Sequence, residues 1–497
     1  MHWLGPLARL VPGKQHKSEP AEQPWNHPRG KTAFSFVVDA DPKLAFQGYH
    51  LAHSLIEHCV EEPKAIHVQV TPEVDSRVRR LFTDLGCNMH EIRRFGDGRY
   101  CNKVAQLENL RDIDIDGAVL LDTDTIVLAD IRLFLAGGAL QAKVVDLANP
   151  SLGALKKAAR LAGMRTLPKT IPVDAGGGKT YLGNCNGGYY AIPKALIPVV
   201  SAEWRRWTLW LLDNSEPLRQ EGKQNHVDQV AMWLAIHMAG IPYEPAPSNL
   251  NYYTHFSGAH RYYDPERPIA LLHYHDSSLN VLGQIEPEAD LTAIEIDAVT
   301  RANAQINRHF DNRVFWDLRY ARFPERGSGV GSRGHNVIYK RELLAREGIV
   351  AAAGVLDVGC GDLEVLKVFD VRDYLGLDQS ETALMLARQA RPDWDFRAFD
   401  LTCDADAIPA KDWVLCFEVL IHQETEDRYR KLIDFIAGKA RETLVVSGYE
   451  AYPRNRRGNH MIFFHEPLEL SLRNTKRFRL IRKIGEHTDV AVFRCDV

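Results

Sequence analysis

The sequence of 497 residues lacks a long hydrophobic run. Its longest apolar stretch, Val230 to Ile241, contains His237 and is shorter than the roughly 18 apolar residues that a membrane-spanning helix needs. The N-terminal segment is interrupted by Gly5, Pro6 and Pro12 and has no continuous apolar core, so we expect no signal peptide. These absences argue against helical membrane spans and favour a cytoplasmic location.

A surplus of one charge and a paired cysteine motif are also missing. The chain carries 61 basic and 65 acidic residues, a formal net charge of -4, which argues against bulk nucleic-acid binding. None of the 8 cysteines has the C-x-x-C spacing of a zinc knuckle or a thioredoxin motif, and their scatter suits free thiols in a reducing compartment. Hydrophobic residues at 45% and charged residues at 25% are typical of a soluble globular protein.

The chain is long enough for two to four domains of about 100–200 residues each. We expect a flexible tail over residues 1–30, a first α/β domain over 31–290, a helical and glycine-rich linker over 291–335, and a second α/β domain over 336–497. The Trp, Leu and basic side chains of the tail leave peripheral association with the inner face of a membrane open. The sequence does not determine the oligomeric state.

Both domains alternate strand and helix patterns, which predicts two doubly wound, mostly parallel sheets covered on both faces. In the first domain we expect strands at TAFSFVVDA, AIHVQVT and GAVLLDTDTIVL, and a helix at FQGYHLAHSLIEHCV. The second domain has seven strand candidates: VLDVG, YLGLD, DFRAFD, DWVLCFEV, ETLVVSG, FRLIRKIGE and TDVAVFRC. We expect helices between the first five, including LEVLKVF after the first strand, and antiparallel pairing of the last two.

The most specific motif is VLDVGCGD, which ends the first strand of the second domain. Glycines at such a turn, here Gly359 and Gly361, let the backbone approach a ligand and leave helix N–H groups free to bind it. Asp378 ends the next strand, where an acidic residue binds ribose hydroxyls in nucleotide folds. Glu364 stands where a dinucleotide site needs a third glycine, which argues against NAD. S-adenosylmethionine carries no phosphate and tolerates an acidic loop.

This half, roughly 310–497, resembles the class I S-adenosylmethionine-dependent methyltransferases. The resemblance implies that Asp357, Gly359 and Gly361 line the methionine end of the cofactor and that Asp378 holds its ribose. It also implies that Asp400 and Leu401 lie at the adenine. For a hydroxyl acceptor we expect a general base, with His422, His465 and Glu418 as candidates; the alternative role of Glu418 is to order the cofactor pocket.

In the first domain, Asp122 and Asp124 follow an apolar strand in the motif D-x-D. Two carboxylates so close together can share a hard divalent cation, Mn²⁺ or Mg²⁺, which clamps a nucleotide diphosphate and stabilises the leaving group. The motif is common in solvated turns, but here apolar residues continue after it as TIVLADI, which places the carboxylates near a core.

The whole first half resembles the GT-A-fold nucleotide-sugar glycosyltransferases of the glycogenin and bacterial galactosyltransferase kind. The resemblance assigns the nucleobase to Asp39 and Ala40, the approach to the donor to Asn102 and Lys103, and the acceptor side to Asn186, Gly187 and Gly188. It matches Asp228 and Gln229 to the D-Q pair of the family, in which Asp228 would be a catalytic residue. It also gives the role of third metal ligand to His273, with His275 in reserve. The lysine that follows this histidine in the family is missing, so Lys103 or Lys179 could replace it, and we expect GGGKT to form a flexible lid rather than a P-loop.

Together these patterns predict two doubly wound α/β domains, a GT-A-like mixed sheet followed by a seven-stranded Rossmann-like methyltransferase. The predicted protein transfers a sugar from a nucleotide-diphosphate sugar to a glycan or glycolipid, with Mn²⁺ or Mg²⁺, and O-methylates with S-adenosyl-L-methionine, on the same glycan. The resemblance favours retention of configuration. Three alternatives stay open: a methyltransferase whose first domain only binds glycans, a scaffold that senses ligands, and a Rossmann oxidoreductase.

Overall fold

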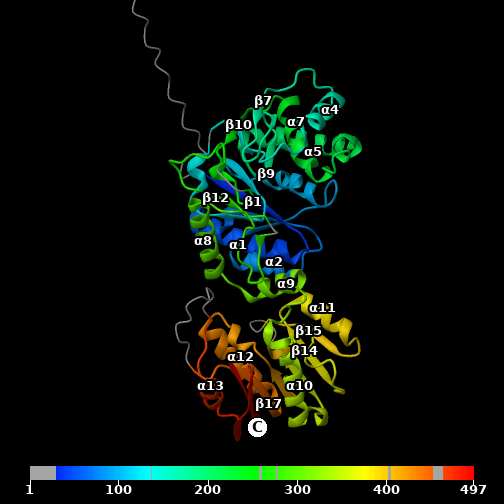
Figure 1. The fold of residues 1–497 in the computed structure, drawn as a ribbon, viewed down its shortest axis with the longest axis vertical. Helices are drawn as coiled ribbons and strands as arrows, with labels where there is room; N and C mark the ends of the chain where they lie inside the picture. Colours follow the sequence, from blue (N-terminus) through cyan, green and yellow to red (C-terminus); the bar gives the residue numbers. More distant parts are fainter. Residues whose placement is uncertain are drawn as a thin grey trace, which may run out of the picture.

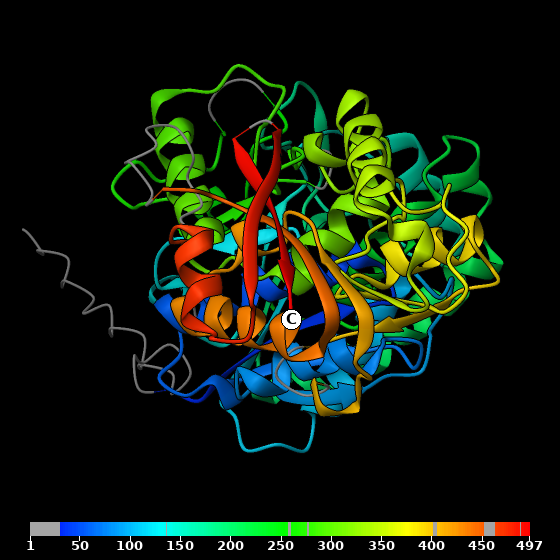
Figure 2. The same cartoon turned by 90° about the horizontal axis from the view of Figure 1, so that it is seen from below.

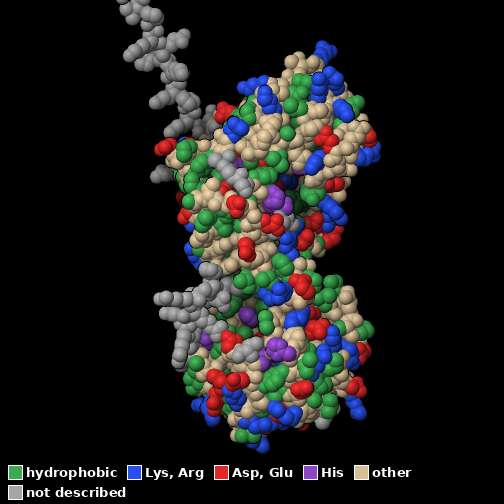
Figure 3. Space-filling view, in the orientation of Figure 1, with side chains coloured by type: hydrophobic (Ala, Val, Ile, Leu, Met, Phe, Trp, Pro, Cys, Tyr) green, Lys and Arg blue, Asp and Glu red, His purple; other side chains and the backbone are tan. Residues whose placement is uncertain are grey.

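The computed structural model describes residues 30–497 except for 136, 257–259, 276–277, 401–404, 452–462 and 488. The predicted tail and Leu401 therefore lie outside the described residues, apart from Gly30. Two α/β units are stacked along the long axis of the molecule, the first from blue to green and the second from green to red (Figure 1). The molecule narrows where the units meet (Figure 3).

The first unit is built around a sheet of seven strands in the order β10-β6-β9-β4-β1-β2-β3. Strand β1 (Thr32–Val38) is apolar and almost wholly buried, and it pairs in parallel with β2 (Ile66–Val70) and β4 (Gly117–Leu121). Strand β9 (Cys185–Pro193) runs antiparallel to β4, so the sheet is mixed. The other strands are β3 (Asn88–Glu91), β6 (Leu140–Val144) and β10 (Tyr243–Ala246).

A smaller sheet of three strands in the order β11-β12-β5 lies beside the first. It consists of β5 (Thr125–Val127), β11 (Tyr252–Tyr253) and β12 (Leu271–His273). A hairpin of β7 (Thr170–Pro172) and β8 (Lys179–Tyr181) carries GGGKT, the segment predicted to form a flexible lid. The helices of this unit are α1 (Pro42–His58), α2 (Ser76–Asp84), α3 (Gln106–Leu110), α4 (Leu152–Leu161), α5 (Ile197–Asp213), α6 (Glu216–Arg219) and α7 (Val227–Met238).

Helix α1 begins at Asp41, whose carboxylate accepts a hydrogen bond from the Lys43 backbone N–H. Pro42 occupies the first turn, where its missing N–H costs nothing. Gly48 lets the helix approach the sheet closely, because a Cβ there would lie 2.9 Å from Val38 Cγ2. The strands predicted at TAFSFVVDA and AIHVQVT and the helix predicted at FQGYHLAHSLIEHCV are confirmed. The segment GAVLLDTDTIVL forms two strands, β4 and β5, which lie in different sheets on either side of the D-x-D turn.

The second unit contains the seven predicted strands in one sheet, in the order β15-β14-β13-β16-β17-β19-β18. The first five run parallel, and β19 runs antiparallel to both of its neighbours, as expected from the short turn that joins the last two strands. Figure 2 shows this red hairpin in front, seen from the end of the molecule away from the first unit. The strands are β13 (Val355–Val358), β14 (Tyr374–Asp378), β15 (Asp395–Ala398), β16 (Lys411–Cys416), β17 (Ala440–Gly448), β18 (Leu480–His487) and β19 (Val490–Asp496).

The helices between these strands are fewer than predicted. The segment LEVLKVF forms a series of turns, and the expectation of a helix there is wrong. Leu363 has φ 66°, a left-handed conformation that a helix cannot contain. Between β15 and β16 the described residues form only a short 3-10 helix, Ala405–Ala407. The remaining helices are α10 (His335–Glu347), α11 (Glu381–Ala390), α12 (Glu426–Lys439) and α13 (Leu468–Asn474).

The predicted linker region contains α8 (Ala293–Arg308) and α9 (Asn312–Arg322). Helix α8 packs its apolar face into the core of the first unit, and α9 contacts both α1 of the first unit and α11 of the second. The Asp317 carboxylate on α9 accepts a hydrogen bond of 2.6 Å from Ser380, the N-cap of α11. Helix α9 is therefore the main connection between the units.

No helix among the described residues is both long and apolar enough to span a membrane.

Two candidate active sites

The D-x-D motif lies in a turn that neighbouring strands hold on both sides. The backbone N–H of Asp122 donates to Gly188 O on β9, over 3.2 Å, and the N–H of Tyr274 donates to Asp124 O, over 3.1 Å. Strand β5 pairs antiparallel with β12, with Thr125 opposite His273. This register brings His273, distant in sequence, next to the two carboxylates.

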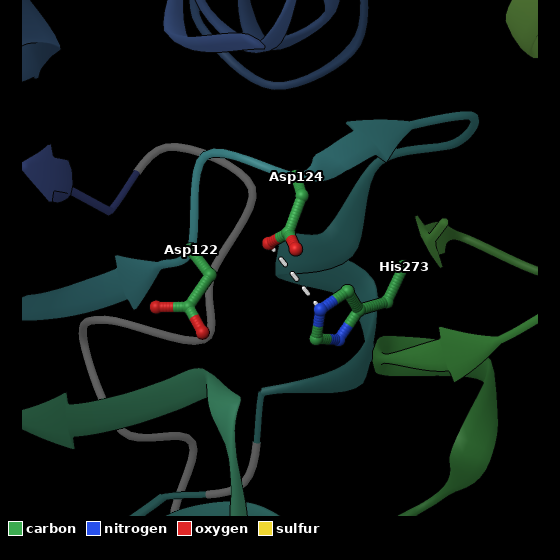
Figure 4. Close-up of side chains that lie close together, drawn as sticks. All are labelled: Asp122, Asp124 and His273. Carbon is green, nitrogen blue, oxygen red and sulfur yellow. Dashed lines mark ion pairs between the residues drawn. The ribbon is translucent and has the colours of Figure 1, made fainter. Parts of the chain in front are cut away.

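Asp122, Asp124 and His273 together form a possible metal-binding group. One ligand atom from each lies within 4.8 Å of the others. Figure 4 shows the Asp124 carboxylate directed at the His273 ring, and Asp124 Oδ1 lies 3.3 Å from His273 Nε2. Burial opposes the charge on Asp124, but His273 outweighs it and lowers the pKa of Asp124 to about 2. Two carboxylates and one imidazole fit the ligand preferences of Mn²⁺, and less closely those of Mg²⁺, which prefers oxygen.

Lys103 lies within this group and does not extend into open space. Its Nζ is 2.6 Å from Asp122 Oδ1, 3.3 Å from Gly187 O and 3.5 Å from Asp228 Oδ2. Asp228, at the start of α7, is buried, and this burial raises its pKa to about 6 even though Lys103 is near. The lysine therefore links the D-x-D motif to the predicted catalytic Asp228.

The residues predicted to hold the donor nucleobase line a cavity of about 890 Å³ beside the D-x-D motif, together with Asn102 and Lys103. Asp39 is already engaged, because Arg94 donates to both carboxylate oxygens over 2.7 and 2.6 Å and Thr71 donates over 2.6 Å. Burial opposes ionisation of Asp39, but these bonds lower its pKa. The sequence analysis missed Arg94, although it follows β3 at the same edge of the sheet as Asp39.

The Asn102 side chain holds a loop, because its Oδ1 accepts from Phe95 N and its Nδ2 donates to Gly98 O. Lys179 lies exposed on the β7–β8 hairpin and does not line the cavity. Lys103 is therefore the better placed of the two lysines proposed for the diphosphate.

The predicted acceptor-side glycines pack against the metal group. A Cβ on Gly188 would lie 2.7 Å from His273 Nδ1 and 3.0 Å from Asn251 Oδ1, so a larger residue there would displace the histidine. A Cβ on Gly187 would lie 3.0 Å from Lys103 Nζ and 3.4 Å from the Gln229 side chain. The sequence analysis also missed Asn251, which lies on a separate loop and becomes a neighbour only in the fold.

In the second unit, the glycine bend after β13 takes a left-handed backbone conformation. Gly359 has φ 78° and Gly361 has φ 55°, and a Cβ on Gly359 would overlap Val419. The N–H groups are not free, however. Gly359 and Cys360 donate to Leu377 O, over 2.8 and 3.0 Å, and Gly361 donates to Asp378 Oδ2, over 2.8 Å. The expectation of free helix N–H groups is wrong, because no helix follows the bend and β14 takes up the N–H groups of the bend itself.

A cavity of about 130 Å³ opens at the carboxyl edge of this sheet. Its wall includes Gly359 of the glycine bend, Asp357, Asp378, Asp400, Glu418 and His422, whereas Gly361 is not among the lining residues. Burial raises the pKa of Asp357 to about 7 and that of Asp378 to about 6. Asp357 accepts a hydrogen bond of 2.8 Å from Tyr374. The cavity thus has buried carboxyl groups, which a bound cation would help to ionise.

Replacing Asp357 with asparagine should stabilise the ligand-free protein at pH 8 more than at pH 5. When folding raises the pKa of a carboxyl group, the folded protein loses stability as the pH rises. For Asp357 this loss runs from the unfolded pKa, near 3.8, to the folded pKa of about 7. Asparagine keeps an acceptor for Tyr374 and removes the buried charge. Thermal unfolding of both proteins at the two pH values checks this, and an equal shift at both would contradict it.

Glu418 lies at the cavity in a left-handed conformation, φ 60°. Its carboxylate lies 2.9 Å from Lys340 Nζ and 3.2 Å from His487 Nε2. The glycine-rich segment packs against it, because a Cβ on Gly331 would overlap the carboxylate. Burial lowers the pKa of Lys340, and the charge on Glu418 opposes this. Glu418 is therefore held as part of the cavity wall, and Lys340 is a contributor that the sequence analysis missed.

The two histidines proposed as a base differ in position. His422, in the 3-10 helix Leu420–His422, lines the cavity beside Trp316, and burial lowers its pKa to about 4. His465 packs against Tyr449 and is not among the residues that line the cavity. The geometry favours His422. Asp400 lies two residues beyond β15 and also lines the cavity.

A scan against models of protein families finds no match for this chain, and a search of curated proteins finds none either. Among solved structures, the methyltransferase domain of bacterial CtHen1 is 18% identical, with 33% of this chain and 99% of that chain covered and a TM-score of 0.28. Magnesium protoporphyrin IX methyltransferase from Synechocystis, with bound SAM, is 18% identical, covering 39% and 89%, with a TM-score of 0.26. The N-methyltransferase NodS from Bradyrhizobium japonicum is 16% identical, covering 33% and 85%, with a TM-score of 0.27.

Proposed function

We propose that the second unit transfers a methyl group from S-adenosylmethionine to a hydroxyl group, and that the first unit is a metal-dependent glycosyltransferase. The observation that carries the first part is the cavity where the glycine bend, Asp357 and Asp378 meet at the carboxyl edge of the sheet. Ligands of doubly wound sheets bind at this edge. The strand order with its antiparallel terminal hairpin also supports this part.

The residues around this cavity suit a cationic nucleoside. In this proposal Asp357 faces the amino group of the methionine end, and Asp378 faces the ribose. When bound, the sulfonium supplies an electrophilic methyl group: the acceptor oxygen forms the new C–O bond while the C–S bond breaks and its electrons return to sulfur. His422 has a pKa of about 4, so it is neutral near pH 7 and able to take the proton that the acceptor hydroxyl loses.

The group formed by Asp122, Asp124 and His273 supports the proposal that the first unit transfers a sugar. Asp122, Asp124 and His273 would hold a divalent cation, which would neutralise charge on the diphosphate leaving group. Lys103 donates a hydrogen bond to Asp122 and so holds a positive charge beside the D-x-D motif. The acceptor in this proposal is a glycan or glycolipid, and methylation acts on the same glycan.

A mass-spectrometric screen tests both activities in the full chain. Purified protein is incubated with a panel of nucleotide-diphosphate sugars, with and without Mn²⁺, and with S-adenosylmethionine labelled in the methyl group. We expect Mn²⁺-dependent loss of one sugar nucleotide and transfer of label to a glycan acceptor. Label transfer without any sugar turnover would favour a methyltransferase whose first unit only binds glycans. Binding of both ligands without any turnover would favour a scaffold and overturn the proposal.

A further inference from the structure

A chain of side-chain hydrogen bonds runs from His273 into the interior of the first unit. His273 Nδ1 lies 2.7 Å from Asn251 Oδ1, and Asn251 Nδ2 donates to Asn186 Oδ1 over 3.0 Å. Asn186 Nδ2 in turn donates to Asp146 Oδ2 over 2.7 Å. Asn251 is 0% exposed and Asp146 is 5% exposed, and Asn186 between them is half-buried, so both ends of the chain are shielded from water. The chain connects a proposed metal ligand to a buried carboxylate.

Partners with a single hydrogen-bonding role decide how the two amides are oriented. The backbone N–H of Gly188 can only donate, and it lies 2.9 Å from Asn186 Oδ1. That atom is therefore the oxygen, and the NH₂ group of Asn186 faces the Asp146 carboxylate, which can only accept. Asn251 must then turn its NH₂ group to Asn186 and its oxygen to His273. An oxygen at that place requires a proton on Nδ1 of His273.

The carboxylate at the inner end of the chain belongs to a buried ionic network. Lys143, 0% exposed, forms ion pairs with both Asp146 and Asp174, and the one with Asp174 is 3.2 Å long. His260 Nδ1 lies 2.5 Å from Asp174, and its Nε2 lies 2.9 Å from Tyr253 O. Both ring nitrogens of His260 face groups that only accept, so both donate. Two cations and two anions then balance, as a buried network requires.

This network is not itself a metal site in the described residues. Asp146, Asp174 and His260 offer ligand atoms within 4.8 Å of one another. The ammonium group of Lys143, however, contacts both carboxylates and takes the place of a cation. Although burial opposes ionisation, the hydrogen bond from His260 and the charge of Lys143 hold the pKa of Asp174 below its usual value. The network's role is to fix Asp146 as an anion.

We propose that Asn251, Asn186 and Asp146 are positioning residues that keep a proton on Nδ1 of His273 and so present its bare Nε2 to a divalent cation. Each bond in the chain points toward the anion, so the bonds polarise one another and make Nε2 a better ligand. Nε2 and Asp124 Oδ1, 3.3 Å apart, are then both acceptors, and only a cation or a proton between them stabilises the pair. The prediction about Mn²⁺ binding rests on the proposed metal site and so on the proposed function. The prediction about the position of the proton on His273 does not.

The first test locates the proton on His273 in the metal-free full chain. The protein is labelled with ¹⁵N-histidine, and the signal of His273 is identified by its loss in His273→Gln. We expect a protonated Nδ1 in the wild type. In Asn251→Leu, which removes the acceptor, we expect Nδ1 to lose its proton while Nε2 donates to Asp124. A wild-type signal with a bare Nδ1 would overturn the proposal without any variant being needed.

The second test measures Mn²⁺ binding by calorimetry. Loss of an outer partner of a metal-bound histidine typically weakens binding about 10–100-fold, and we expect a loss in this range for Asn251→Leu. Asp146→Asn should weaken binding by roughly 3-fold or more, since the chain loses its anionic end. Asp174→Asn is the matched control: it removes the same charge from the same lysine but has no bond to Asn186, and it should bind Mn²⁺ as the wild type does.

The two tests separate this inference from the proposed function. If the wild type binds no Mn²⁺, the metal site of the proposed glycosyltransferase is wrong, and the proton position on His273 still decides the positioning role. If Mn²⁺ binds equally to the wild type and to a folded Asn251→Leu protein, the positioning role is wrong and the metal site stands. Equal weakening of Mn²⁺ binding in Asp146→Asn and Asp174→Asn would also overturn the positioning role, because equal losses would indicate a general effect of charge.

Discussion

Replacing Gly359 with alanine is expected to weaken the binding of S-adenosylhomocysteine to the second unit strongly. The position has φ 78°, which costs an alanine about 1–2 kcal/mol, and the new methyl group would overlap Val419 in the cavity wall. Overpacking at a buried site typically adds about 1–3 kcal/mol. Since about 1.4 kcal/mol corresponds to a tenfold change in affinity, we expect a loss of at least roughly 30-fold, measured by calorimetry.

A second glycine in the same unit provides the control. Gly438 lies in helix α12, and a Cβ there would meet nothing within 4 Å. Gly438→Ala should therefore keep the affinity and raise the free energy of unfolding by about 0.5–1 kcal/mol. If Gly359→Ala binds the ligand as tightly as Gly438→Ala does, the glycine bend is not the cofactor site.

Replacing Asp124 with asparagine is expected to abolish metal-dependent turnover of the nucleotide sugar. Asp124 faces His273 across 3.3 Å, and the neutral amide cannot supply the charge that a divalent cation requires. Mn²⁺ affinity should fall by more than about 100-fold, because loss of outer partners alone already costs roughly 10–100-fold. Donor hydrolysis should fall by about 10³-fold, since a cation at a leaving group supplies several kcal/mol.

An exposed carboxylate of the same unit serves as the comparison. The Asp112 side chain is 83% exposed, so Asp112→Asn changes the net charge equally and should leave both readouts unchanged. Mn²⁺-dependent turnover that persists in Asp124→Asn would show that the D-x-D motif does not hold the catalytic metal. Thermal unfolding of each variant establishes that it is folded.

Much of the fold could be predicted from local sequence patterns. The seven strands of the second unit were recognisable because each buried strand is a short apolar run bounded by turn residues, and this signal depends only on neighbours along the chain. The turn at Gly359 and Gly361 after β13 followed from the same kind of local reasoning, although its left-handed angles did not. The helix expected at LEVLKVF did not form. The segment makes turns after Leu363, its left-handed first residue, and a pattern of apolar residues does not report that angle.

The composition and short motifs of the sequence by themselves determined the two α/β units, the acidic turn at Asp122 and Asp124, and the glycine bend. Only the tertiary structure decided which side chains meet there. His273 reaches Asp124 through the pairing of β5 with β12, and Asn251 reaches His273 from another loop. Such contacts depend on strand register and on packing between distant segments, and a one-residue shift in register would turn His273 to the opposite face.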